Sequence, residues 1–254
     1  MSGYRSSRTR SLDFALLLLV AVALAGSAVL LWPRHPAAEH DRASVVTAPH
    51  KPTMLFIGDS YAGNADPGET SYGCIAAVEM GWRCELAALP GTGYFSGGSA
   101  NRFVSNTYTG EQSTSFAERI TELRTVYRPD VVVLDGGRND GLLPPQELLQ
   151  TMTYTIGLVH ETWPDAQVVV VRPRFLDNAS ADLGLDDALI AQLNADPQAQ
   201  GVTVVDPIGT VAAQNPDPAD LLIDDGVHPN SSGAQELAAA LVAELEARGL
   251  GGAT

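Results

Sequence analysis

The stretch of sequence that decides the fold is Met54-Leu55-Phe56-Ile57-Gly58-Asp59-Ser60-Tyr61. Its apolar residues precede a glycine, a carboxylate and a hydroxyl, which is typical of a buried parallel strand that ends at a turn. Open α/β sheets bind ligands at the carboxyl ends of their strands. Ser60 therefore follows the first strand at the edge where a ligand would bind, although Gly-Asp-Ser alone also suits an ordinary turn.

Apolar runs and amphipathic segments alternate along the rest of the chain. Strands that alternate with helices form parallel βαβ units, so the sequence predicts an α/β fold with a five-stranded parallel sheet and helices on both faces. The polar stretch 96–114 has little periodicity, and we expect it to be a loop on the substrate side. The other expected strands are 83–89, 131–134, 168–171 and 202–205, and the expected helices are 71–80, 115–127, 145–162, 185–193 and one that begins at Ser231 or Ser232.

The N-terminal segment predicts export. Residues 14–32 are uncharged, and at about 1.5 Å per residue they are long enough to cross a bilayer as a helix. The arginines at positions 5, 8 and 10 indicate that the basic tail 1–13 stays in the cytoplasm. A cleaved signal peptide is the alternative, because Ala23-Leu24-Ala25 resembles a cleavage site. We expect a single-pass membrane anchor over 14–32, or a secreted protein after cleavage.

Either interpretation places the rest of the chain outside the cytoplasm. We expect a linker over 33–52 and one folded domain over 53–249, a length that suffices for a sizeable core. In an oxidising compartment Cys74 and Cys84 can form a disulfide, although two separate buried thiols are the alternative. No second cluster of cysteine and histidine residues has metal-ligand spacing, so we expect no metal.

Charge is distributed unevenly along the 254 residues. Residues 1–50 carry five basic and three acidic side chains, a net charge of +2, and the remainder carries ten basic and 27 acidic side chains, a net charge of −17. A domain this acidic repels phosphate backbones, so nucleic-acid binding is not expected.

The candidate residues for chemistry follow strands or lie in late loops. A serine hydroxyl needs a general base, and the base needs an orienting group. His228 is the natural base for Ser60, since the competing His160 lies on a predicted helix away from the strand ends. Asp225 lies three residues before His228 and can reach its Nδ1–H, although Asp224 is of the same type.

Attack on an ester also creates an oxyanion, which requires donors already aimed at it. The backbone N–H of Ser60, the backbone N–H of Gly91 and the side-chain amide of Asn139 are suitable. Gly93 is an alternative to Gly91, because both glycines belong to one Gly-Thr-Gly triplet.

These motifs together resemble the SGNH hydrolases, also called the GDSL esterase/lipase family. The resemblance rests on Gly58-Asp59-Ser60, Gly91, Gly137-Arg138-Asn139-Asp140 and Asp225-Gly226-Val227-His228 in this order, and it covers about 53–245. It implies a flavodoxin-like three-layer α/β/α fold with strand order 2-1-3-4-5. It also implies Ser60 as nucleophile, His228 as base, Asp225 as its partner, and Ser60, Gly91 and Asn139 as oxyanion donors.

The sequence departs from the family pattern at a few positions. Tyr61 stands where the family name expects leucine, and Arg138 occupies the free position of the G-x-N-D motif. The stretch 90–94 differs from the commonest second motif. The G-x-S-x-G elbow of α/β-hydrolases is absent, since Ala62 stands where its second glycine would be.

The sequence therefore predicts a membrane-anchored extracytoplasmic serine esterase that needs no cofactor. Acyl transfer or deacetylation of cell-envelope glycan with the same residues, and a non-catalytic binding module on the same scaffold, are the alternatives. Tyr94, Phe95, Arg102 and Phe103 are predicted to line the substrate site, and Arg138 is a further candidate. Neither the substrate nor the oligomeric state is readable from the sequence.

Overall fold

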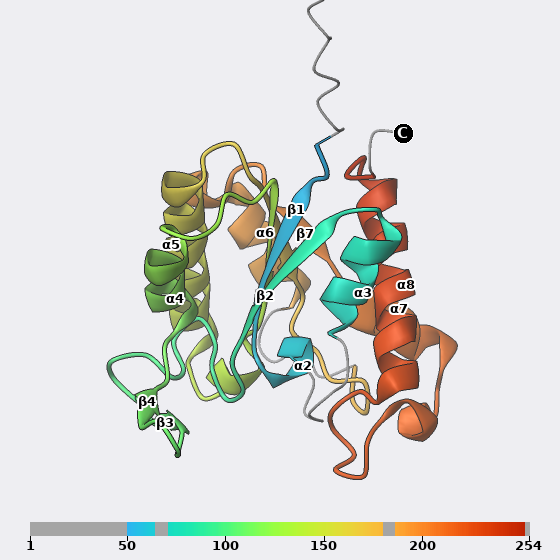
Figure 1. Cartoon of the computed structure of the whole chain (residues 1–254). Helices are drawn as coiled ribbons and strands as arrows, with labels where there is room; N and C mark the ends of the chain where they lie inside the picture. The colour runs from blue at the N-terminus through green and yellow to red at the C-terminus, as the bar shows by residue number, and fades with distance from the viewer. Residues whose placement is uncertain (1–49, 64–70, 180–185, 252–254) are drawn as a thin grey trace, which may run out of the picture. The chain divides into compact units, whose positions relative to one another are not determined.

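The domain is a three-layer α/β/α structure around one parallel sheet (Figure 1). A computed structural model describes residues 50–63, 71–179 and 186–251. The strand order is β2-β1-β5-β6-β7, and each neighbouring pair is parallel. This order is the 2-1-3-4-5 arrangement that the family resemblance implies. The strands are β1 (Thr53–Gly58), β2 (Arg83–Ala88), β5 (Val131–Asp135), β6 (Gln167–Val171) and β7 (Thr203–Val205).

Helices cover both faces of the sheet. One layer contains α3 (Tyr72–Glu79), α7 (Pro207–Gln214) and α8 (Ser231–Ala247), and the other contains α4 (Phe116–Leu123), α5 (Pro145–Thr162) and α6 (Asp187–Ala195). The helix α7 is absent from the sequence prediction. Its N-cap is Asp206, whose side chain accepts the backbone N–H of Gly209 at 2.9 Å.

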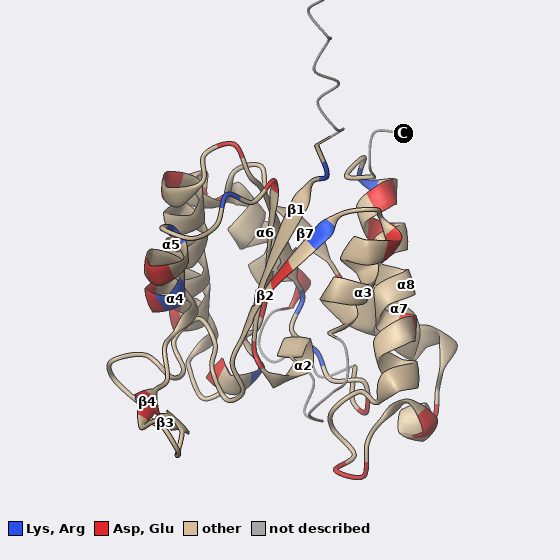
Figure 2. Cartoon of the chain, in the orientation of Figure 1, with Lys and Arg blue, Asp and Glu red and all other residues tan. Residues whose placement is uncertain are grey.

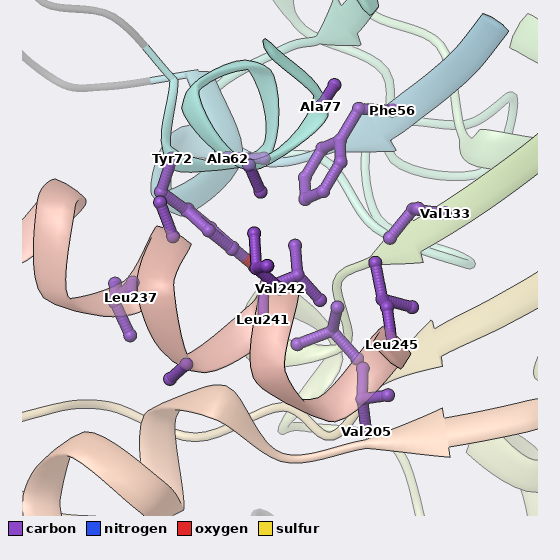
Figure 3. Close-up of a cluster of buried hydrophobic side chains, with 14 of the residues drawn as sticks. Phe56, Ala62, Tyr72, Ala77, Val133, Val205, Leu237, Leu241, Val242 and Leu245 are labelled. Atoms are coloured by element: carbon purple, nitrogen blue, oxygen red, sulfur yellow. The ribbon is translucent and has the colours of Figure 1, made fainter. Parts of the chain in front are cut away.

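The two cores follow from the alternation of side chains along buried strands. Met54 and Phe56 of β1 face α3 and α8, whereas Leu55 and Ile57 of the same strand face α4 and α5. Figure 3 shows the first core, where the Phe56 ring packs against that of Tyr72 of α3 in a cluster that also contains leucines of α8. Because β1 is buried on both faces, its sequence is apolar without interruption, as in the stretch that precedes Ser60.

The carboxyl ends of the strands lie at the end of the domain opposite the point where the described chain begins (Figure 1). The short helix α2 (Ser60–Gly63) follows β1 at this edge. The stretch 96–114 is not simply a loop, because it contains an antiparallel hairpin of β3 (Val104–Asn106) and β4 (Glu111–Gln112). In its short strands apolar and polar residues do not alternate, and for this reason the sequence does not reveal them.

Acidic side chains are concentrated on the helices and loops rather than in the sheet (Figure 2). No helix within the described ranges has the length and hydropathy of a membrane span. The predicted anchor 14–32 and most of the predicted linker 33–52 lie outside those ranges.

Cys74 and Cys84 form a disulfide that joins α3 to β2, as the sequence predicts. The bridge closes a loop between residues ten positions apart. We expect the double substitution Cys74→Ser/Cys84→Ser to lower the free energy of unfolding by about 2–3 kcal/mol, because the unfolded chain gains the entropy of the open loop. Urea unfolding followed by circular dichroism measures the difference, and a loss below about 0.5 kcal/mol would contradict this entropic account.

Candidate active site

Three side chains from distant parts of the chain meet at the carboxyl edge of the sheet. Ser60 Oγ lies 2.8 Å from His228 Nε2, and His228 Nδ1 lies 2.6 Å from Asp225 Oδ2. With the imidazole proton on Nδ1, the ring donates to Asp225 and accepts from the serine hydroxyl. In this arrangement a histidine can withdraw a proton from a serine while a carboxylate orients the ring.

The turn that carries Asp225 fixes the direction of its carboxylate. Asp225 Oδ1 accepts the backbone N–H groups of Val227 at 2.8 Å and His228 at 3.0 Å, which leaves Oδ2 for the imidazole. The hydrogen bond from the His228 side chain, together with these two backbone donors, lowers the pKa of Asp225 from 3.8 to about 2. The carboxylate is therefore ionised wherever the imidazole can act as a base. The alternative acid, Asp224, lines a neighbouring cavity instead.

The nucleophile candidate is held by a braced turn. Ser60 is the first residue of α2, and Asp59 Oδ1 accepts the backbone N–H of Tyr61 at 2.8 Å. The Asp59 N–H donates to the carbonyl oxygen of Asp135 at 3.3 Å, so the turn is also tied to the end of β5.

A buried ionic cluster lies next to this turn. Arg138 Nη1 lies 3.3 Å from Asp59 Oδ2, and its Nη2 lies 2.8 Å from Asp135 Oδ1. Arg138 Nε donates to the carbonyl oxygen of Arg174 at 2.8 Å, and the guanidinium stacks 4.4 Å from the centre of the Tyr61 ring. The position occupied by leucine in the family name is therefore an aromatic platform for Arg138.

Burial, opposed in part by Arg138, raises the pKa of Asp59 from 3.8 to about 6. Between these two pH values the folded state binds more protons at Asp59 than the unfolded state does. The contribution of Asp59 to the free energy of unfolding should therefore fall by about 2–3 kcal/mol as the pH rises from about 4 to about 7.

The substitution Asp59→Asn tests this pH dependence. We expect the difference in unfolding free energy between the wild type and Asp59→Asn to change over this interval, because only the wild type has a titrating group at this position. Urea unfolding at several pH values gives both curves. Parallel curves for the two proteins would show that Asp59 does not titrate there.

The structure distinguishes the two glycine candidates for the oxyanion site. Gly91 has a φ of +74°, is exposed, and its N–H has no acceptor within the described ranges. Gly93 instead donates its N–H to the carbonyl oxygen of Ser96 at 3.0 Å. A Cβ at Gly93 would lie 2.2 Å from Asp140 Oδ2, so Gly93 is needed for close packing. Gly91 is the glycine whose N–H can reach a ligand.

Asn139 lies beside the same loop. Its Nδ2 donates to the carbonyl oxygen of Thr92 at 2.9 Å, and the residue is exposed. The second hydrogen of this amide remains for a ligand. The N–H of Ser60, at the start of α2, likewise has no acceptor in the described part of the chain. The three predicted oxyanion donors are thus available at one edge of the sheet.

Asp140 fastens the two loops that carry Gly91 and Asn139. Its Oδ2 accepts the backbone N–H of Tyr94 at 2.8 Å, and its Oδ1 accepts those of Ser96 at 2.7 Å and Phe95 at 3.3 Å. Ser96 Oγ donates to the carbonyl oxygen of Asn139 at 2.7 Å. The last residue of the G-x-N-D motif therefore acts as an acceptor for a loop, and not as an acid or base.

The predicted substrate wall differs from the structure at two residues. Arg138 does not face a substrate, because its side chain is only 2% exposed and is paired with two carboxylates. Tyr94 is also buried, where it packs against Phe116, and Phe95 is half-buried. They were candidates for the substrate wall because a loop after a strand is normally exposed, with plain packing as the alternative. Phe103 is partly exposed, and its ring lies against Gly91.

Sequence analysis missed one residue beside the site. Arg119 lies in α4 and is buried, with hydrogen bonds to the ends of β1 and β2 and to Thr92. A signal was available, because Arg119 lies between Phe116 and Ile120 on the face of the helix that the apolar residues define.

Fold and site together are those of a hydrolase built on a three-layer α/β/α sheet, with a serine, a histidine and an aspartate in contact at its carboxyl edge. The chain belongs to the GDSL-like lipase/acylhydrolase family, whose model matches residues 56–236. This family membership confirms the resemblance seen in the sequence. No curated protein matches the chain as a sequence relative.

Solved structures show the same fold at low sequence identity. The psychrotrophic esterase EstA from Pseudoalteromonas sp. superposes with a TM-score of 0.55 at 16% identity, over 77% of this chain and 97% of that chain. A family two carbohydrate esterase from Clostridium thermocellum, in complex with cellohexaose, gives a TM-score of 0.51 at 20% identity, over 80% of this chain and 66% of that chain. The salicylyl-acyltransferase SsfX3 superposes with a TM-score of 0.54 at 19% identity, over 80% of this chain and 57% of that chain.

Proposed function

We propose that the chain is a serine esterase that hydrolyses acyl or acetyl esters through an acyl-enzyme. The observation that carries the proposal is the continuous relay from Ser60 Oγ through His228 to Asp225, with distances of 2.8 and 2.6 Å. Membership of a lipase/acylhydrolase family supports the reaction class.

The mechanism follows from the donors and acceptors at the site. His228 Nε2 takes the proton of Ser60 as Oγ attacks the ester carbonyl carbon, and Asp225 stabilises the resulting imidazolium. The N–H groups of Ser60 and Gly91 and the amide of Asn139 donate to the oxyanion. His228 then gives its proton to the departing alkoxide, which leaves Ser60 acylated. Water, deprotonated by His228, attacks the acyl-enzyme. The bond to Ser60 Oγ then breaks, His228 returns the proton to Oγ, and the acid is released.

Hydrolysis is favoured over acyl transfer by the exposure of the relay. The Asp225 side chain is 42% exposed, that of His228 is 22% exposed, and Asn139 is exposed as well. A transferase has to exclude water from its acyl-enzyme, whereas this relay is open to solvent. Transfer to, or deacetylation of, a cell-envelope glycan with the same residues remains the alternative.

We further propose that the domain lies outside the cytoplasm, joined to the membrane by residues 14–32. The Cys74–Cys84 disulfide supports an oxidising compartment, and the uncharged segment supports the anchor. Membrane fractionation of cells that express the full chain, with and without carbonate extraction, distinguishes an anchored from a secreted protein.

The test of the esterase proposal is labelling of the purified full-length protein with a fluorophosphonate, which reacts with activated serines. We expect one adduct, located at Ser60 by mass spectrometry, and turnover of short p-nitrophenyl esters. Absence of both labelling and turnover would favour a non-catalytic binding module. Product analysis with an added sugar acceptor separates hydrolysis from transfer, since an acylated sugar would form only by transfer.

The charge near the site predicts substrate preference. A cavity of about 480 Å³ adjoins the Asp225 turn, and its lining includes Asp177, Asp217 and Asp224 but no basic residue. We expect kcat/KM for a p-nitrophenyl hemisuccinate to be about tenfold lower than for the neutral butyrate at low salt. The difference in kcat/KM between the two esters should become smaller at about 0.5 M NaCl, because salt screens exposed charges.

The variant Asp217→Asn/Asp224→Asn provides the control for this preference. Neutralising two of the carboxylates should narrow the gap at low salt without changing kcat for the butyrate. If the wild type had the same kcat/KM for the two esters at all salt concentrations, electrostatic selection at this cavity would be excluded.

A further inference from the structure

Arg119 uses all five of its N–H groups to join segments around the candidate oxyanion site. Nη1 donates to the carbonyl oxygens of Gly58 at 3.0 Å and Ala87 at 2.6 Å. Nη2 donates to Thr92 Oγ1 at 2.7 Å and to the carbonyl oxygen of Thr114 at 3.0 Å, and Nε donates to Thr114 Oγ1 at 3.5 Å. The residue is only 6% exposed.

These contacts reach two of the segments that carry a proposed oxyanion donor directly, and they reach the third through Thr92. Gly58 lies two residues before Ser60, and Thr92 follows Gly91 directly. The carbonyl oxygen of Thr92 accepts Asn139 Nδ2 at 2.9 Å, so the third donor is tied to the same threonine. Thr92 is fully buried, and its hydroxyl donates in turn to the carbonyl oxygen of Leu89 at 2.6 Å.

The guanidinium is also a buried positive charge that faces neutral acceptors. In the part of the chain that the structure describes, no carboxylate forms an ion pair with Arg119, and its guanidinium carbon lies 5.5 Å from the centre of the Phe116 ring. Burial lowers the pKa of Arg119 from 12.5 to about 10, so the side chain stays charged at neutral pH. Burying a cation opposite neutral groups costs free energy that an apolar side chain would not cost.

We propose that Arg119 is a positioning residue of the oxyanion site: it sets the spacing of the loops that carry the three donors. The same contacts fix a positive charge behind the loop where negative charge develops during the reaction. The inference rests on the proposed function, since an oxyanion forms only if Ser60 attacks a carbonyl group. Lysine cannot replace this role, because one ammonium group with three donors cannot serve five acceptors spread over a plane.

The test compares Arg119→Met, Arg119→Lys and Thr92→Val in the full chain. We expect Arg119→Met to lower kcat per titrated active site about a hundredfold, with KM changed less than about threefold. The kcat of Arg119→Lys should lie between that of Arg119→Met and that of the wild type, because lysine keeps the charge but lacks the planar guanidinium with its five donors. Burst titration with a fluorophosphonate counts the competent sites, so a variant that merely misfolds loses sites while each remaining site keeps its kcat.

Two further measurements separate positioning from general damage. The acid limb of the pH–rate profile should not move, because Arg119 does not contact His228 or Asp225. The double variant Thr92→Val/Arg119→Met should be no slower than Arg119→Met alone, since both changes break the same contact. Arg124→Met, which removes an exposed arginine from the end of α4, should leave kcat unchanged.

Hydrogen exchange tests the loop without reference to turnover. Amide exchange over residues 89–93 should accelerate in Arg119→Met and in Thr92→Val, because both lose the contact that holds the loop. If the wild type shows no turnover, the proposed function fails, and faster exchange alone supports the positioning role. Exchange unchanged from the wild type, or kcat per titrated site within about twofold of the wild type, overturns the inference.

Discussion

Ser60→Ala is expected to lower kcat for p-nitrophenyl acetate by a factor of at least about 10⁴, because Ser60 supplies the one hydroxyl that meets the imidazole within the described residues. The structure places Ser60 Oγ 2.8 Å from His228 Nε2, the distance of a hydrogen bond through which the proton can move. Alanine removes the nucleophile and leaves the base intact. His228→Ala should produce a loss of similar size, since an unactivated serine hydroxyl is a poor nucleophile.

The combination of the two substitutions gives a sharper result. Substitutions within one catalytic unit do not add their effects, because the first already abolishes the function of the unit. The kcat of Ser60→Ala/His228→Ala should therefore be no lower than that of either single variant. Ser99→Ala is the control, because Ser99 is an exposed serine outside the relay. Thermal unfolding verifies that the variants fold. Full activity in a folded Ser60→Ala protein would remove Ser60 from the mechanism.

The Asp225 turn adds a pH dependence to this expectation. With a pKa of about 2, Asp225 keeps its charge down to strongly acidic pH. Protonation of Asp225 should therefore not contribute to the loss of activity on the acid side above about pH 3. In Asp225→Asn the two backbone N–H donors hold the amide oxygen, so the NH₂ group faces Nδ1 and favours the wrong imidazole tautomer. We expect kcat to fall by about 10³ to 10⁴.

Much of the fold follows from the sequence because the strands are buried on both faces. Runs such as Met54–Ile57 and Val131–Leu134 are apolar throughout, as is typical of strands in a parallel sheet that helices cover on both faces. The strand order, by contrast, came from the family resemblance and not from these runs. The hairpin at 104–112 was not predicted because its strands are short and largely exposed, so no hydrophobic pattern marks them.

The site was predictable where sequence neighbours define it. Asp225 and His228 lie in one turn, and their spacing of three residues indicates the contact that the structure shows. The residues that support the site were not predictable, because their partners are remote in sequence. Arg119 reaches Gly58 across 61 positions and Arg138 reaches Asp59 across 79. A charged residue on an apolar helix face indicates a buried partner, but it does not say which one.

The buried ionic cluster predicts the largest loss of stability. Arg138 separates the carboxylates of Asp59 and Asp135, and burial excludes the water that would otherwise screen them. Burial acts against the charged form of Arg138, but the two carboxylates outweigh it and raise the pKa of the guanidinium above its usual value. Arg138→Met leaves both carboxylates buried without a counter-charge, so we expect the free energy of unfolding to fall by about 3–5 kcal/mol at pH 8.

The pH dependence of this loss identifies its cause. Without Arg138, one of the two carboxylates takes up a proton more readily, because like charges in a buried site cannot both ionise easily. The loss should therefore be smaller at pH 5 than at pH 8, and Asp59→Asn in the Arg138→Met background should recover part of it. Urea unfolding followed by circular dichroism at both pH values measures these differences.

Arg248→Met is the matched control, because Arg248 forms an exposed ion pair with Glu244 at the end of α8. Exposed pairs of this kind contribute about 0.5 kcal/mol or less. A loss at Arg138 no larger than that at Arg248 would show that the cluster is solvated in solution. A large loss that is equal at pH 5 and pH 8 would instead assign the effect to the packing of Arg138 on Tyr61, since stacking does not depend on the charge of the carboxylates.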